Sequence, residues 1–131
     1  MIGVDTNVLV RYLTQDDALQ SARATRIFEQ TLTATEPGFI SLVTLAETVW
    51  VLERSYGLSA LEVAAIIERI LQAETLVVQN EQEVFTAMCL LKSGNASFSD
   101  ALIGALGTWA GCRSTLTFDR RAARLAGFTL G

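Results

Sequence analysis

Short apolar runs alternate along the chain with longer stretches in which apolar residues recur every three or four positions. Runs of strand length cover residues 2–4, 39–42, 76–78, 114–118 and 128–130. They are almost continuously apolar, which is typical of parallel strands covered on both faces. The pattern therefore predicts an α/β sandwich with a central, mainly parallel sheet.

The intervening stretches predict amphipathic helices. They cover residues 6–13, 16–32, 43–56, 61–73, 81–93, 100–111 and 119–126. Gly57, Gly94 and Gly127 follow three of these helices, and glycine is a common residue just past a helix end. Ser59 and Ser99 precede two others and are expected to cap them.

Length and composition point to one globular domain. The 131 residues show no internal repeat, low-complexity tract or break in composition, so we expect a single domain over residues 1–131. Half of the residues are hydrophobic and 18% are charged. The longest uncharged apolar run, 101–112, is shorter than the roughly 18 residues of a membrane span. The first residues lack the basic region of a secretory signal, so we expect a cytoplasmic protein without a membrane partner.

The residue composition excludes several kinds of catalytic and metal site. There is no histidine, which excludes Ser-His-Asp hydrolases, Cys-His proteases and His-ligated zinc sites. Cys89 and Cys112 lie in apolar helical sequence and are expected to be reduced core residues. The formal net charge is −4, and nine of the ten basic residues are arginines. This arginine bias suits bidentate contacts to phosphate or carboxylate groups.

Three aspartates stand where ligands bind in α/β proteins. Asp5 and Asp119 each follow an apolar strand and precede a helix. The crevice beyond the carboxyl ends of parallel strands is the usual ligand site. Asp100 opens a helix that is apolar on nearly every side. For each of the three, a helix-capping role is an equally good alternative.

Glu47 lies inside a helical segment, where capping cannot apply. It shares a face with Val43 and Trp50, so we expect it to point inward, with a buried ion pair as the alternative role. If the four acids converge, each pair about 4 Å apart costs ~4 kcal/mol at an effective dielectric near 20. Cations would offset this repulsion, and an all-oxygen ligand set favours Mg²⁺ or Mn²⁺.

Four segments resemble a known family. IGVDTNVLVRYL, SLVTLAETVWVL, FSDALIGALG and TLTFDRRAARLAGF are similar to the PIN domain, and more closely to the toxin ribonucleases of VapBC-type toxin-antitoxin modules. The resemblance implies an α/β/α three-layer sandwich, Mg²⁺- or Mn²⁺-dependent endonucleolytic cleavage of RNA, a homodimer and a cognate antitoxin. The resemblance also implies a catalytic metal site of Asp5, Glu47, Asp100 and Asp119, supported by the polar residues Thr6, Asn7 and Thr117.

Other residues have less specific roles. The candidate contacts to RNA phosphates are Arg11, Arg120, Arg121 and Arg124, with a solvated helix face as an equal alternative. Gly104, Gly107 and Gly111 indicate close helix packing, because no strand precedes them as in a nucleotide-binding motif. Trp50 and Trp109 are expected in the core in preference to a role in base stacking.

Two other functions compete with the nuclease interpretation. One is a non-catalytic PIN-like interaction module, which the presence of all four acids disfavours. The other is an aspartyl-phosphate phosphotransferase with Asp5 as nucleophile. The phosphotransferase hypothesis is weaker, because the chain has DTN at the position where a DxDxT pattern would supply a second acid. The apolar surface of the predicted hairpin 43–73 suits either a protein interface or ordinary core packing.

Overall fold

The computed structural model describes all 131 residues. Contacts within the chain divide it into two compact units: Met1–Ser59 with Arg69–Gln79, and Ala60–Glu68 with Asn80–Gly131. Helix α4 (Ala60–Gln72) contributes residues to both. The single domain expected from the sequence stays a prediction. No helix is long and apolar enough to cross a membrane.

The first unit contains a three-stranded parallel sheet in the order β1-β2-β3. Its strands are β1 (Ile2–Gly3), β2 (Gly38–Ile40) and β3 (Leu76–Val78). Side chains pack closely against Gly38 at the start of β2: a Cβ there would lie 2.7 Å from Leu32 Cδ1 and 3.1 Å from Leu76 Cδ2. The sheet is therefore closely covered on this side.

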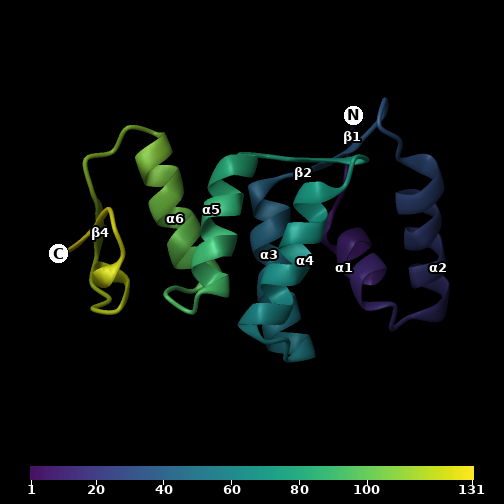
Figure 1. Cartoon of the computed structure of the whole chain (residues 1–131). Coiled ribbons are helices and arrows are strands. Elements are labelled where there is room, and N and C mark those ends of the chain that lie inside the picture. The colour runs from purple at the N-terminus through teal and green to yellow at the C-terminus, as the bar shows by residue number, and fades with distance from the viewer. The chain divides into compact units, whose positions relative to one another are not determined.

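Helices α1 (Thr6–Thr14), α2 (Ala18–Arg26) and α3 (Leu42–Tyr56) pack in the first unit, and α1 contacts both of the others (Figure 1). Gln15 ends α1 in the left-handed conformation, with φ 56°, and its side chain donates to Tyr12 O at 2.9 Å. This cap turns the chain back into α2. The helix continues as a π-helix, η1 (Ile27–Thr31).

The second unit contains a helical hairpin and a two-stranded parallel sheet. Helices α5 (Glu81–Lys92) and α6 (Phe98–Trp109) lie side by side (Figure 1). Strand β4 (Thr115–Thr117) pairs with β5 (Phe128–Leu130), and the 3₁₀ turn η2 (Ala122–Arg124) lies between them in sequence.

Two glycines of α6 explain how closely this helix approaches the β4–β5 segment. A Cβ on Gly104 would lie 2.5 Å from Phe128 Cε2, and one on Gly107 would lie 2.6 Å from Thr115 Oγ1. The prediction of close packing is confirmed at these two positions. Gly111 instead occupies a turn, with φ +88°.

The predicted α/β class with parallel strands is confirmed, but the strands form two sheets where one was expected. Each strand is two or three residues long. So short an apolar run identifies a strand without specifying which neighbour it pairs with.

Two helix predictions were wrong in detail. The helix expected at 119–126 is reduced to the three-residue turn η2, in which only Ala122 is buried. Helix α6 begins two residues earlier than expected, because Ser97, and not Ser99, caps it; the Ser97 Oγ accepts from the Asp100 N–H at 3.2 Å.

The cysteines and tryptophans are also more exposed than expected. Cys89 and Cys112 are free, as predicted, but both are exposed. Trp50 and Trp109 are 58% and 65% exposed, so the prediction that they lie in the core is wrong. Helical periodicity places a residue on a face but does not show what covers that face.

Candidate functional site

Asp5 lies at the junction of β1 and α1. The strand ends at Gly3, Val4 is buried, and Asp5 turns the chain into the helix as its N-cap, with φ −81° and ψ 160°. Its Oδ1 accepts from the Thr6 N–H at 2.7 Å. The residue is exposed and no hydrogen bond engages Oδ2. Asp5 therefore caps the helix with one oxygen and has the other available for a ligand.

Thr6 connects Asp5 to Glu47. Its hydroxyl donates to Glu47 Oε1 at 2.7 Å, while its backbone N–H donates to Asp5. Two carboxylates from different helices thus flank one half-buried threonine. Thr6 is one of the polar residues that the sequence singled out.

Glu47 itself is exposed, so the expectation that it points inward was wrong. Val43 and Trp50 share its face of α3, as expected, and are 70% and 58% exposed. The carboxylate makes no ion pair. The alternative role in a buried ion pair is therefore excluded.

Asp100 occupies the first turn of α6, where the helix dipole favours a negative charge. It is not the N-cap residue, since Ser97 fills that position. Its side chain is half-buried and engages no hydrogen-bond partner. The carboxylate thus remains available for a ligand.

Asp119 stands between β4 and η2. Its Oδ1 accepts from the N–H groups of Arg121 at 2.8 Å and Ala122 at 3.4 Å. Its own N–H donates to Thr117 Oγ1 at 3.0 Å. The side chain is exposed and Oδ2 has no hydrogen bond, so Asp119, like Asp5, combines a capping oxygen with an available one.

The four acids divide between the two units: Asp5 and Glu47 belong to the first, and Asp100 and Asp119 to the second. No group of three or more acidic or cysteine side chains lies close enough to hold one metal ion. A shared site for all four stays a prediction. The chemistry of the donors fits hard cations, because every available atom is a carboxylate oxygen and the chain has no histidine.

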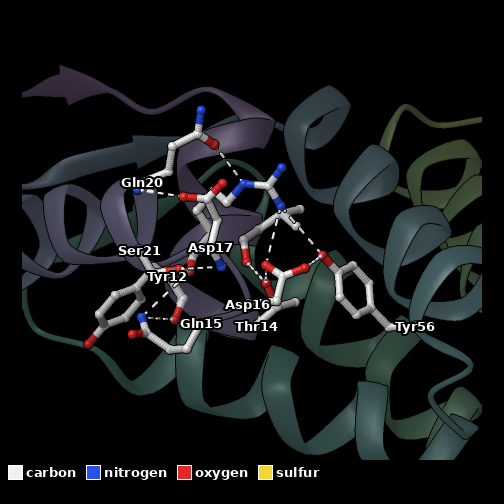
Figure 2. A network of polar contacts seen from close by, with 10 residues as sticks. Tyr12, Thr14, Gln15, Asp16, Asp17, Gln20, Ser21 and Tyr56 are labelled. Atoms are coloured by element: carbon white, nitrogen blue, oxygen red, sulfur yellow. Dashed lines mark hydrogen bonds and ion pairs between the residues drawn. The ribbon is translucent and has the colours of Figure 1, made fainter.

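Arg11 belongs to a polar network at the other end of α1. Its Nε donates to Gln20 Oε1 at 2.7 Å, and its Nη1 lies 3.3 Å from Asp16 Oδ1. The Tyr56 hydroxyl donates to Asp16 Oδ2 at 2.5 Å, which joins α3 to the connection between α1 and α2 (Figure 2). Together with the Thr14 hydroxyl, this bond holds the pKa of Asp16 below its usual range. Arg11 is therefore already paired within the protein.

The other candidate arginines are exposed and make no ion pair; they are Arg120, Arg121 and Arg124. Asn7 and Arg11 line a cavity of about 220 Å³ between α1 and α2. Arg23 also lines it, and sequence reasoning missed this residue. Only the packing of α2 on α1 identifies it, because nothing in the local sequence distinguishes Arg23 from its exposed neighbour Arg26.

The fold and these side chains define a class of protein. Asp5 and Asp119 follow parallel strands, at the position where ligands bind in α/β proteins, and their carboxylate oxygens suit divalent cations. The family model for the PIN domain matches residues 2–128, and the chain belongs to this family. PIN domains are generally nucleases that use divalent metal ions. A comparison with curated proteins finds no match.

Proposed function

We propose that this protein is an endoribonuclease that hydrolyses phosphodiester bonds in RNA with Mg²⁺ or Mn²⁺. Its metal site would comprise Asp5, Glu47, Asp100 and Asp119. The observation that carries the proposal is the double contact of Thr6, which brings two of these acids together in a PIN domain. All four carboxylates are oxygen donors, and such donors suit these two ions.

Three of the four acids have one oxygen held by a hydrogen bond and one available: Asp5, Glu47 and Asp119. Hydrogen bonds of this kind fix the orientation of a ligating carboxylate. Asp100 adds a further oxygen donor. The free oxygen of Glu47 either ligates the ion or orients the attacking water.

A bound divalent ion supplies Lewis acidity: it lowers the pKa of the attacking water and offsets charge at the phosphate. A histidine base is then unnecessary, in agreement with its absence from the chain. Attack by water does not involve the 2′-hydroxyl group. We expect products with 5′-phosphate and 3′-hydroxyl ends.

We also propose that the protein is the toxin of a type II toxin-antitoxin pair and acts in the cytoplasm as a homodimer. The support is the similarity of its four motif segments to VapC-type toxins. A cognate antitoxin would restrain the nuclease by covering the acids. Growth arrest on expression, relieved by the Asp5→Asn substitution, tests this finer assignment. Undiminished arrest by the variant would contradict it.

The Asp5→Asn variant tests the nuclease directly. Asparagine preserves the volume and the helix cap but replaces one available carboxylate oxygen, so we expect cleavage of a fluorescent RNA in Mn²⁺ to fall at least about 100-fold. Asp17→Asn is the matched control, since Asp17 caps α2 through a 2.9 Å bond to the Gln20 N–H. It should cleave at the wild-type rate.

Product chemistry gives a second readout. EDTA should abolish cleavage, Mg²⁺ or Mn²⁺ should restore it, and the 5′ ends should ligate without prior phosphorylation. Retained cleavage by Asp5→Asn, or cyclic-phosphate products, would show that the proposed site is wrong.

A further inference from the structure

A cavity of about 470 Å³ lies beside the turn that holds Asp119. Its size falls in the range of small-molecule sites, about 300–1,000 Å³. Gly94 and Asn95 line it from the turn after α5, and Arg121 and Arg124 line it from the η2 segment. None of its lining residues is acidic.

The 3₁₀ turn brings the two arginines to one face. The Arg124 N–H donates to Arg121 O at 3.2 Å. In a 3₁₀ helix, side chains three positions apart are eclipsed, in agreement with both arginines lining the same cavity. Arg120 does not line this cavity. Asp119 fixes this turn through the Arg121 N–H, which links the cavity to a proposed metal ligand.

Both arginines carry uncompensated charge. They are exposed, and neither makes an ion pair. A guanidinium group carries several N–H donors in a planar fork that matches the oxygens of a phosphate group, and two arginines line this cavity. Arg11, by contrast, is already paired with Asp16.

The opposite wall does not repel an anion strongly. Helix α5 ends there, but its last carbonyls are capped: the Gly94 N–H donates to Leu91 O at 3.0 Å and the Asn95 N–H to Leu90 O at 3.2 Å. Gly94 has φ +78°, as this cap requires. The Asn95 amide donates to Ser93 Oγ at 2.9 Å and has a second N–H for a ligand.

We infer that this cavity binds a phosphate group of the RNA backbone, next to the phosphodiester that the enzyme cleaves. The assignment to RNA rests on the proposed function, whereas the preference for phosphate rests on the cavity alone. The pair Arg121 and Arg124 would position the strand relative to Asp119. A free phosphate ion has the same chemistry and is the alternative that the experiment separates.

The test measures binding without cleavage. A fluorescein-labelled single-stranded RNA is titrated in EDTA at several salt concentrations with three proteins: wild type, the double variant Arg121→Ala/Arg124→Ala, and Arg26→Ala. Arg26 is exposed and lines neither this cavity nor the cavity between α1 and α2, so Arg26→Ala measures the effect of removing one positive charge elsewhere. Circular dichroism confirms that each variant is folded.

We expect the double variant to bind RNA at least about tenfold more weakly. The slope of log K against log salt should fall in magnitude by about 0.7, the value for one phosphate contact on a single strand. Arg26→Ala should change neither quantity. If the double variant loses no more than twice as much binding free energy as Arg26→Ala, a general charge effect explains both results and the inference is overturned.

Two further measurements are made. One distinguishes RNA from free phosphate as the ligand, and the other tests the proposed nuclease separately from the phosphate site. Millimolar inorganic phosphate should compete with RNA in the wild type but not in the double variant. If phosphate binds the wild type while the double variant retains full RNA affinity, the cavity serves free phosphate and the RNA assignment is wrong. Cleavage in Mn²⁺ is scored separately. Its absence in the wild type would contradict the proposed nuclease, while cavity-dependent binding in EDTA would still support the phosphate site.

Discussion

Thr6 is the residue on which the geometry of the first acid pair depends. Removing its hydroxyl while keeping its shape, as in Thr6→Val, leaves Glu47 Oε1 without its donor. We expect a loss of less than about 1 kcal/mol in unfolding free energy, because the bond is exposed to water. Cleavage should fall about 10–100-fold, as is usual when the support of a metal ligand is lost.

Thr6→Ser keeps the hydroxyl and should retain most of the activity. Urea unfolding and Mn²⁺-dependent cleavage measure the two effects. Equal cleavage rates for the valine and serine variants would show that the contact to Glu47 does not position this acid.

Asp16 gives the folded state a dependence on acid pH. Its pKa is lowered from 3.8, first by the hydrogen bond from the Tyr56 hydroxyl and then by that from Thr14. The unfolded chain therefore binds the proton more readily. The contribution of Asp16 to stability is full above pH 3.8 and is lost as the pH falls through the lower pKa of the folded state.

Asp16→Asn should flatten the fall in unfolding free energy below pH 4, and Tyr56→Phe should flatten it partly. Urea unfolding at a series of pH values measures both. A slope in Asp16→Asn that matches the wild type would exclude this role.

One N-cap residue, Ser97, sets the start of helix α6. Ser97 has extended backbone angles, φ −68° and ψ 156°, and its side chain accepts from the Asp100 N–H. Ser97→Ala should lower the unfolding free energy by about 1 kcal/mol. Ser99→Ala is the matched control, since Ser99 is exposed and caps nothing. Chemical denaturation compares them, and equal costs would contradict the assignment.

Several short segments predicted from the hydrophobic pattern were correct, and one predicted helix was not. The strand predictions at 76–78 and 128–130 match β3 and β5. The helix ending before Gly57 is also confirmed, since Gly57 caps α3 with φ 63°. The predicted helix at 119–126 fails because its arginines leave little apolar surface to bury, and short helices depend on such burial.

For the whole molecule, metal binding tests whether acids from both ends of the chain share one site. Mn²⁺ at a hundredfold excess over its Kd should stabilise the fold by ~2.7 kcal/mol. Asp5→Asn and Asp119→Asn should each remove most of this effect if one ion needs both residues. Thermal melts with EDTA and with Mn²⁺ provide the measurement.

The outcome distinguishes a shared site from separate ones. If Asp5→Asn abolishes the Mn²⁺ effect and Asp119→Asn leaves it intact, the ion binds the Asp5–Glu47 pair alone. If neither substitution changes it, the proposed ligands are wrong.

The sequence by itself determined the α/β class, most strand and helix segments, the close packing at Gly104 and Gly107, and the family. These depend on local periodicity and on motifs that are contiguous in the chain. Only the tertiary structure showed that Thr6 reaches Glu47, that Arg11 is paired with Asp16, and that Arg121 and Arg124 share a cavity with Asn95. It also showed that Trp50 and Trp109 are exposed. The physical reason is that periodicity assigns a side chain to a face, whereas packing between residues distant in sequence determines what meets that face.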